Sequence, residues 1–523
     1  MQETRFKPMG LFPLVPSLFG LIAAFHLGSA LLGKSRCKRL WGSHLSFPVA
    51  QTLLDESRRG AQASDMRTPS LHWLSGEIFR IGAMVATLAS MPAACSATAT
   101  GGALADYVHG PDTAFAWEKT EERQVQGLSV IQLNLTSQVW RGITWRHQML
   151  VVRPAQVRNP DTAFLFITGD GDVTKEFSML RMLALRAGAI AGVVNHVPNQ
   201  PLYGGRKEDA LIAFTFDQYL KTGDRTWPLL FPMVKTAVRA IDTEQALAHQ
   251  QFGQTLRRFV VCGASKRGWT TWLTAAVDDR VKAIAPAVID MLNMTVQARW
   301  AQEIWGRQSE QIKDYTDLHL IARLTGPNDA RGVELRQWVD PYSYRKQYTM
   351  PKLLLLGTND PYWVVDALRN YWPALPEPKL VFQTPNAGHD LAGAAEAKQT
   401  LAAFFQMVAD RQPLPRMTWQ FQTNHAHSAE IDVTVEPPAR AFLLWTADSK
   451  DRDFRNDKWS SKPLQTNGGA NVIATVETPL HGFRACMVEA EMVSPTGDPY
   501  RLSTEVRVTP DGPPAKSPIT AGH

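Results

Sequence analysis

The stretch Phe259–Thr270, which reads FVVCGASKRGWT, has the pattern of a strand, a sharp turn and a helix. Apolar and β-branched residues fill its first positions, a glycine breaks the run, and residues from Trp269 to Val277 are typical of a helix. Ser265 stands at the turn, where a strained backbone can expose a hydroxyl above a parallel sheet. The motif is G-x-S-x-x-G rather than the usual G-x-S-x-G, because Arg267 stands two residues after the serine. Taken alone, this match leaves an ordinary turn as the alternative.

Apolar runs of strand length alternate with helical patterns on both sides of this stretch. Such alternation is typical of βαβ units and predicts a mostly parallel, doubly wound sheet of the α/β class. The long, aromatic-bearing segment 295–339 interrupts the alternation, and we expect it to be an inserted helical cap. The predicted strands are 163–168, 189–195, 281–289, 352–356 and 379–383, preceded by antiparallel strands at 130–135 and 143–152.

A change of pattern after residues 413–415, which read PLP, indicates a second domain. Between residues 416 and 510 short apolar runs are spaced by turn residues, with no helical pattern between them. This pattern predicts a small all-β sandwich that folds as a cooperative unit of its own. We therefore expect an α/β domain at 103–412, a β-sandwich at 416–510 and a flexible tail at 511–523.

Two residues that a nucleophilic serine requires follow Ser265 in the chain. A serine hydroxyl is a poor nucleophile at its usual pKa, so it needs a base, and the base needs an acid that orients it. Asp360 ends one predicted apolar strand, and His389 follows the next. The order serine, aspartate, histidine, each after a strand, is that of an α/β-hydrolase. The sequence therefore predicts a triad of Ser265, Asp360 and His389, with Asp366 as the alternative acid.

An oxyanion hole requires two backbone N–H groups that point at the charge developing on the carbonyl oxygen. We expect one from Lys266, directly after the serine, and the other from the turn at Gly169 and Asp170, where glycine allows close approach. Arg267 occupies a position that is usually small, so its side chain must point away or pair with an acid, for which Asp290 and Glu208 are the candidates.

Four residues are candidates for substrate binding. Trp269 on the helix after the serine and Trp363 after the predicted acid could line a pocket, although an aromatic core is the alternative for both. Glu208 and Asp209 could capture a substrate amine, as acidic pairs do in some aminopeptidases, or could stabilise the first turn of a helix through its dipole. The sequence contains no metal-ligand cluster and no phosphate loop, so we expect no metal and no cofactor.

The composition is that of a globular protein, with 44% apolar and 20% charged residues. The net charge of +6 is concentrated at the start, because residues 1–65 hold eight Lys or Arg and four Asp or Glu. A basic leader on a nearly neutral remainder does not predict a nucleic-acid partner. The four cysteines, at positions 37, 95, 262 and 486, are too scattered for a disulfide framework. The oligomeric state stays open.

Two export-like segments precede residue 103. Residues 66–99 contain a positive start, an apolar run and small residues, which is the form of a secretory signal peptide. The apolar run Met9–Gly33, closed by lysines and arginines, could instead be a membrane anchor. Because two export signals in series would be redundant, we favour Met66 as the start and residues 1–65 as upstream translation. We expect a periplasmic or secreted protein, attached to a membrane only through this leader or through a lipid at Cys95.

The motif Gly263–Trp269 is accompanied by four other distinctive motifs, at Val197–Leu202, Glu208–Ala213, Gly357–Asp360 and Asp451–Arg455. Together they resemble the PhoPQ-activated pathogenicity-related protein family, over residues 103–510. The resemblance implies an exported protein with an α/β-hydrolase-like fold, and the name of the family connects it to a virulence regulon. The long leader before Met66 departs from the pattern of the family.

Two functions of different classes are consistent with these observations. The complete triad favours a serine hydrolase, esterase or peptidase-like, that acts on a small ester or a short peptide. The alternative is a catalytically silent secreted protein that keeps the fold for binding or signalling. A binding protein has no need for a base and an acid in register with a serine, so we favour the hydrolase.

Overall fold

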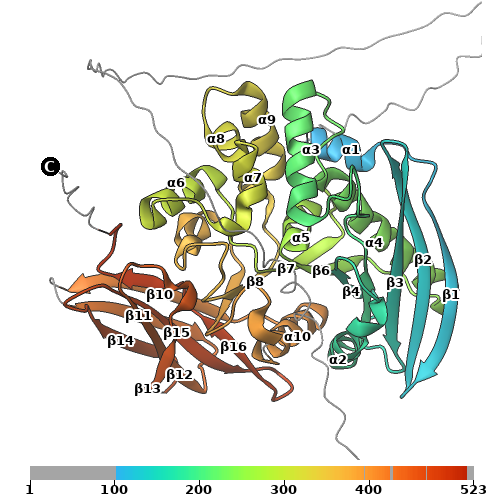
Figure 1. Cartoon of the computed structure of the whole chain (residues 1–523). Helices are drawn as coiled ribbons and strands as arrows, with labels where there is room; N and C mark the ends of the chain where they lie inside the picture. The colour runs from blue at the N-terminus through green and yellow to red at the C-terminus, as the bar shows by residue number, and fades with distance from the viewer. Residues whose placement is uncertain (1–101, 394, 425–427, 467, 515–523) are drawn as a thin grey trace, which may run out of the picture. The chain divides into compact units, whose positions relative to one another are not determined.

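The computed structural model describes residues 102–393, 395–424, 428–466 and 468–514, and a nine-stranded sheet lies at its centre (Figure 1). Its strands are β1 (Ala116–Val125), β2 (Leu128–Trp140), β3 (Ile143–Pro154), β4 (Thr162–Ile167), β5 (Ile190–Val194), β6 (Arg258–Ala264), β7 (Val281–Ala287), β8 (Lys352–Gly357) and β9 (Lys379–Thr384). They lie in the order β1-β2-β3-β5-β4-β6-β7-β8-β9. The strands β5, β4, β6, β7, β8 and β9 run parallel to one another. The strands β1, β2 and β3 pair antiparallel with their neighbours, and β3 also pairs antiparallel with β5. The predicted α/β-hydrolase fold with a mostly parallel sheet is confirmed.

Helices cover both faces of this sheet, because successive side chains of a strand point to opposite faces. Phe164 and Leu165 are neighbours on β4, yet they belong to two different buried clusters, one on each face. The face of Leu165 is covered by α1 (Gly102–His109), α4 (Leu230–Phe252) and α5 (Lys266–Ala275), and that of Phe164 by α2 (Phe177–Ala187) and α10 (Ala395–Ala409).

The segment between β7 and β8, for which the sequence predicts a cap, is helical. Three of its helices pack against α3, which follows β5, and Figure 1 shows them side by side. Short breaks divide the segment, so it is a group of helices rather than one long helix. The helices of this segment are α6 (Met294–Trp305), α7 (Lys313–Asp317), α8 (Leu320–Thr325) and α9 (Ala330–Val339), and α3 outside it spans Glu208–Thr222.

After α10 the chain forms two antiparallel sheets, which confirms the predicted all-β part (Figure 1). Ile431 of one sheet and Phe442 of the other lie in one buried cluster, so the sheets pack through their apolar faces. The cluster also includes α10, and the backbone of Arg501 is hydrogen-bonded to Thr400 on that helix. That this part folds as a unit of its own stays a prediction. One sheet is β10 (Arg416–Asn424), β11 (Ser428–Glu436) and β14 (Asn471–Glu477); the other is β12 (Ala441–Ser449), β13 (Ser460–Leu464), β15 (Phe483–Val493), β16 (Pro499–Ser503) and β17 (Arg507–Thr509).

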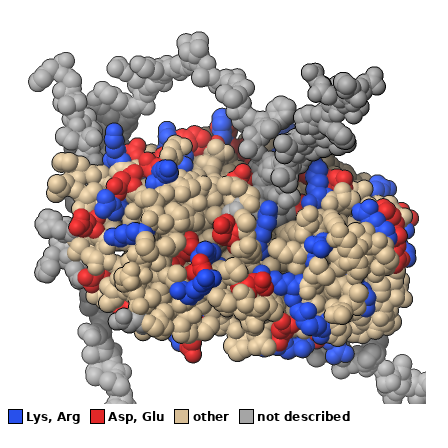
Figure 2. Space-filling model, turned by 90° about the horizontal axis from the view of Figure 1, so that it is seen from below, with Lys and Arg blue, Asp and Glu red and all other residues tan. Residues whose placement is uncertain are grey.

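Basic and acidic side chains are interspersed on the face of the molecule drawn in Figure 2. Among the described residues, no helix is long and apolar enough to cross a membrane. The predicted signal peptide, anchor and lipid site at Cys95 lie outside the described residues, as does the end of the predicted tail from residue 515.

Candidate active site

Ser265 stands at the turn between β6 and α5, with φ of 57° and ψ of −122°. A positive φ is rare for a residue with a side chain, and such strain persists only where the surrounding structure fixes it. Gly268 makes the turn possible: a Cβ there would come within 2.8 Å of Ile289 Cγ2 and 2.9 Å of Ala287 O. The start of α5 therefore comes closest to the chain at and after β7 at Gly268, three residues after the serine. This explains why the motif has glycine at that position and tolerates Arg267 one residue earlier.

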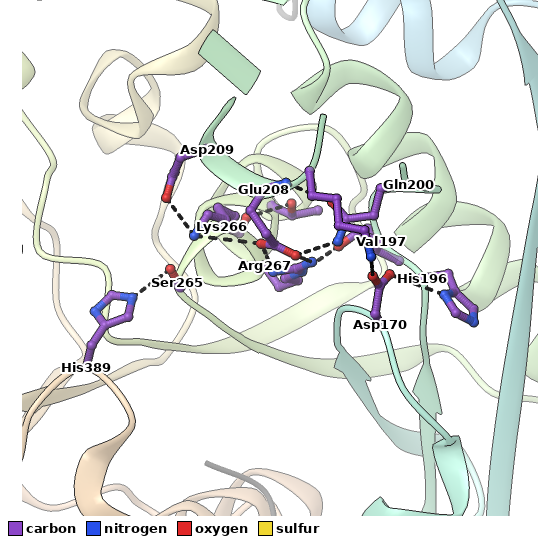
Figure 3. Close-up of polar contacts among 12 residues, drawn as sticks. Asp170, His196, Val197, Gln200, Glu208, Asp209, Ser265, Lys266, Arg267 and His389 are labelled. Atoms are coloured by element: carbon purple, nitrogen blue, oxygen red, sulfur yellow. Dashed lines mark hydrogen bonds and ion pairs between the residues drawn. The ribbon is translucent and has the colours of Figure 1, made fainter. Parts of the chain in front are cut away.

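The side chains of Ser265, His389 and Asp360 form a hydrogen-bonded series, of which Figure 3 shows the pair Ser265 and His389. His389 Nε2 lies 2.7 Å from Ser265 Oγ, and its Nδ1 lies 2.8 Å from Asp360 Oδ2. The N–H of Tyr362 donates to the other oxygen of Asp360 at 3.0 Å, which fixes the carboxylate. An Nδ1–H held by Asp360 leaves Nε2 free to accept the serine proton, the arrangement in which histidine acts as a base.

Gly357 at the end of β8 allows the segments that carry Asp360 and His389 to come together. A Cβ at this position would collide with the carbonyl oxygen of Ala387, so the loop after β9 lies directly on the backbone of β8. The backbone N–H of Asn359 donates to the same oxygen at 2.9 Å. The turn that carries Asp360 and the loop that carries His389 therefore support each other.

The alternative acid, Asp366, is fully buried and points elsewhere. It accepts hydrogen bonds from Arg452 at 2.9 Å, from Trp300 at 3.0 Å and from Arg369 at 3.2 Å. No contact between Asp366 and His389 occurs in the described part of the chain, so Asp360 rather than Asp366 is the carboxylate that contacts His389.

Two cations that follow the serine pair with two acids at the start of α3 (Figure 3). Arg267 binds both oxygens of Glu208, at 2.6 and 2.7 Å, and Lys266 Nζ lies 2.8 Å from Asp209 Oδ2. Burial alone would raise the pKa of Glu208, but the charge and hydrogen bonds of Arg267, with the charge of Lys266, lower it to about 2. Of the two predicted partners for Arg267, the structure places Glu208 there.

A neighbouring motif completes this cluster, and sequence reasoning assigned it no role. Gln200 Nε2 donates to Glu208 at 2.6 Å, and the backbone N–H of Glu208 donates back to Gln200 Oε1 at 2.8 Å. Val197 O accepts a hydrogen bond from Arg267 Nε. The motifs at 197–202, 208–213 and 263–269 therefore meet at one place. In the sequence, the only sign that these three motifs belong together is that all three are distinctive, because no periodic pattern connects them.

Asp209 is connected to the base through aromatic side chains. Tyr315 donates to Asp209 Oδ1 at 3.0 Å and Tyr362 to its Oδ2 at 3.3 Å. The ring of Tyr362 stacks on the imidazole of His389, with centroids 4.1 Å apart and planes inclined by 28°. Tyr362, which the sequence gave no reason to select, thus links the base to the Lys266–Asp209 ion pair.

The predicted oxyanion donors lie beside the same cluster. Lys266 is the first residue of α5, and the first N–H groups of a helix have no partner within it. Gly169 packs so closely under the guanidinium of Arg267 that a Cβ would come within 2.5 Å of Nη2. Asp170 is paired with Lys207 at 3.1 Å and with His196 at 3.4 Å. Its side chain is therefore turned to other partners, and only backbone N–H groups of this turn stay candidates.

A pocket of about 130 Å³ opens beside Ser265. Trp269 and Trp363, both predicted to bind substrate, line it, and so do Asp209 and Lys266. Trp269 also donates to the carbonyl oxygen of Val339 and is only 6% exposed. It therefore lines the pocket and also belongs to the buried core. Glu208 does not line the pocket.

Comparisons with known proteins agree with the motifs. The PhoPQ-activated pathogenicity-related protein family matches residues 104–455. The autocrine proliferation repressor protein A of Dictyostelium discoideum is 30% identical over 458 residues, which cover 78% of this chain and 90% of that protein. Similar solved structures include acetyl xylan esterase 1 from Thermoanaerobacterium sp. JW/SL YS485, with 16% identity and a TM-score of 0.42 over 58% of this chain and 91% of that one. An S-formylglutathione hydrolase from Agrobacterium tumefaciens has 12% identity and a TM-score of 0.39, over 57% and 100%.

Proposed function

The chain belongs to the family of PhoPQ-activated pathogenicity-related proteins, and from its site we propose that it is an exported serine hydrolase that cleaves small esters. The observation that carries the proposal is the series from Ser265 Oγ through His389 to Asp360, with both distances under 3 Å. A strained serine at the end of a central strand supports it, because such strain tends to be kept at functional sites.

The first half of the reaction forms a covalent intermediate. Ser265 Oγ attacks the ester carbonyl while His389 Nε2 takes the serine proton, and Asp360 stabilises the imidazolium that results. The carbonyl oxygen gains negative charge and accepts hydrogen bonds from Lys266 N–H and from the turn at Gly169 and Asp170. When the tetrahedral intermediate collapses, the C–O bond to the alcohol breaks and His389 gives its proton to the departing alcohol.

The second half restores the serine. Water attacks the acyl group while His389 takes one of its protons, and the acid is released as the proton returns to Ser265 Oγ. Both halves use the same base and the same oxyanion donors, so no further group is needed.

The contacts of Glu208 and Asp209 favour an ester over an amino-terminal peptide substrate. Each carboxylate already accepts from side chains of this protein, Glu208 from Arg267 and Gln200, and Asp209 from Lys266, Tyr315 and Tyr362. A substrate ammonium group would have to displace a buried cation from its acid, which is costly. Capture of a substrate amine is therefore the weaker of the two hypotheses.

A second candidate function is binding or signalling without turnover. It is favoured by the relative that is 30% identical, whose name describes an autocrine proliferation repressor. A fluorophosphonate probe separates the two candidates, because it reacts only with an activated serine. Wild-type protein should be labelled, and Ser265→Ala should not be. Absence of labelling in folded wild-type protein would favour the silent binding protein.

Export is proposed from the segment 66–99, whose sequence has the form of a signal peptide. Fused to a reporter that is active only outside the cytoplasm, this segment should produce activity. A silent reporter that residues 1–65 restore would instead assign export to the first apolar run.

A further inference from the structure

The pocket beside Ser265 has walls that are mostly apolar. These walls come from the cap helices, from α5 and from the loops after β7 and β8. A cavity of similar size, about 150 Å³, that is lined by apolar side chains holds a benzene molecule in another protein. The apolar lining includes Trp269, Ile289, Met294, Ile321, Leu324 and Trp363.

The polar side chains in the lining are already hydrogen-bonded to this protein. Asp209 accepts from Lys266 and two tyrosines, as described above. Four others each donate to a backbone carbonyl oxygen, which leaves fewer donors for a ligand. They are Gln297, which bonds to Ala367 at 3.0 Å, Gln308, which bonds to Ala298 at 2.8 Å, Ser309, which bonds to Pro361 at 2.8 Å, and Thr325, which bonds to Ile321 at 2.7 Å.

A polar ligand group would lose its hydrogen bonds to water here and find few partners, which disfavours its binding. Trp363 is the exception, since its buried indole N–H has no partner among the described residues. The lining therefore suits a ligand group that is apolar.

Resting on the hydrolase function proposed above, we propose that this pocket binds an apolar group of about the size of a phenyl ring in the substrate. The substrate class is then a neutral ester with an aromatic or branched alkyl group next to the scissile bond, on its acyl or its alkoxy side. Sugar-like or charged groups are disfavoured at this position because the polar side chains of the walls are largely paired within the protein.

Binding can be measured without hydrolysis. Ser265→Ala protein is titrated by calorimetry with acetophenone, and with 2-butanone, which has a carbonyl group but no ring. We expect acetophenone to bind at least tenfold more tightly. Adding Ala298→Phe, which fills the pocket from α6, should remove this preference. The control is Ala322→Leu on the exposed side of α8, which should keep it.

Hydrolysis identifies the side of the ester that enters the pocket. With Ser265 intact, methyl benzoate places a ring on the acyl side, benzyl acetate places one on the alkoxy side, and methyl acetate has none. Ala298→Phe should lower kcat/KM for the ester whose ring enters the pocket at least tenfold more than for methyl acetate, in line with the effect of apolar group size on specificity.

The outcomes separate this inference from the hydrolase proposal. Equal binding of acetophenone and 2-butanone, or a change of equal size for all three esters in Ala298→Phe, would overturn the apolar pocket even if the protein is an esterase. Tight acetophenone binding that Ala298→Phe abolishes, in a wild-type protein that cleaves none of the esters, would uphold the pocket and reject the hydrolase.

Discussion

Asn386 and Trp459 exchange two hydrogen bonds: Asn386 Nδ2 donates to Trp459 O at 3.0 Å, and Trp459 N–H donates to Asn386 Oδ1 at 2.8 Å. Asn386 lies three residues before His389, in the loop that carries the base. Trp459 belongs to the C-terminal part of the chain, between β12 and β13.

Asn359 makes the corresponding contact from the turn that carries the acid. Its Nδ2 donates to the carbonyl oxygen of Phe454 at 3.0 Å and to that of Asp457 at 2.8 Å. The segment 454–459 therefore contacts both the turn that carries Asp360 and the loop that carries His389. From this arrangement we expect the C-terminal part to position Asp360 and His389 rather than only to accompany the hydrolase domain.

Removing either contact should lower turnover. We expect Asn359→Ala and Asn386→Gly each to reduce kcat by up to about a hundredfold, since small displacements of catalytic groups have effects of that order. Glycine is chosen at 386 because φ there is 57°. Steady-state kinetics with a p-nitrophenyl ester measures the effect. Asn134→Ala, at an exposed position on β2, is the control, and wild-type kcat in both test variants would contradict the positioning role.

The two candidate acids should fail in different ways. Asp360→Asn should reduce kcat by about four orders of magnitude, the effect of a mispaired tautomer in such triads, with little change in stability. Asp366→Asn should instead lower the free energy of unfolding by about 3–5 kcal/mol, because it leaves the buried Arg452 with only the half-exposed Asp511, 3.8 Å away, as an anionic partner. Ester hydrolysis and urea unfolding of both variants provide the comparison. The reverse pattern would reassign the acid.

Local patterns in the sequence were sufficient to predict the sheet and to select Ser265, Asp360 and His389, whose side chains the structure joins by hydrogen bonds. The strands of the parallel sheet are buried on both faces, so they appear as continuous apolar runs, and a residue at the end of such a run is placed by the sheet itself. Asp360 and His389 were therefore predictable from their positions after such runs.

Contacts between distant segments were not predictable in this way. Arg267 packs against Gly169 and pairs with Glu208 because three loops come together in the folded chain. No periodic pattern in the sequence predicts that these loops are neighbours. The stacking of Tyr362 on His389 and the contact of Asn386 with Trp459 are of the same kind, since each joins side chains whose segments come together only in the folded chain.

The Glu208–Arg267 pair should make stability depend on acid pH. The pKa of Glu208 is lowered from 4.5 to about 2 in the folded protein, so its contribution is complete above about pH 4.5 and is lost as the pH falls toward 2. Glu208→Gln should cost about 2–3 kcal/mol at pH 7, a reduced value because the side chain is 38% exposed. The difference from wild type in urea unfolding should shrink between pH 4.5 and 2. If the loss of unfolding free energy in Glu208→Gln is independent of pH, or equals that of the exposed control Glu303→Gln, the Glu208–Arg267 pair does not make stability depend on pH.

Tyr362 offers a pair of variants that separates stacking from hydrogen bonding. Tyr362→Phe keeps the ring on His389 and loses only the 3.3 Å bond to Asp209, so its kcat should stay within about threefold of wild type. Tyr362→Ala removes the ring and frees the imidazole to rotate. We therefore expect kcat to fall at least tenfold, as it does when catalytic groups are slightly displaced. Equal losses in both variants would assign the role to the hydroxyl.

The C-terminal sheets should form a cooperative unit of their own. Expressed alone, residues 416–512 should fold into a β-rich domain, because the two sheets bury their apolar faces against each other. Arg452 provides the test of context, since it is fully buried in the whole chain and two of its partners, Asp366 and Trp300, belong to the hydrolase part. Arg452→Asn, which suits the φ of 68° at this position, should cost the full chain about 3–5 kcal/mol by leaving Asp366 short of a cation. In the isolated fragment Asp366 and Trp300 are absent and the 3.8 Å contact with the half-exposed Asp511 stays, so the same change should alter the free energy of unfolding by less than about 0.5 kcal/mol. Circular dichroism of the fragment and urea unfolding of all four proteins give the answer. A disordered fragment would show that these sheets complete the hydrolase core.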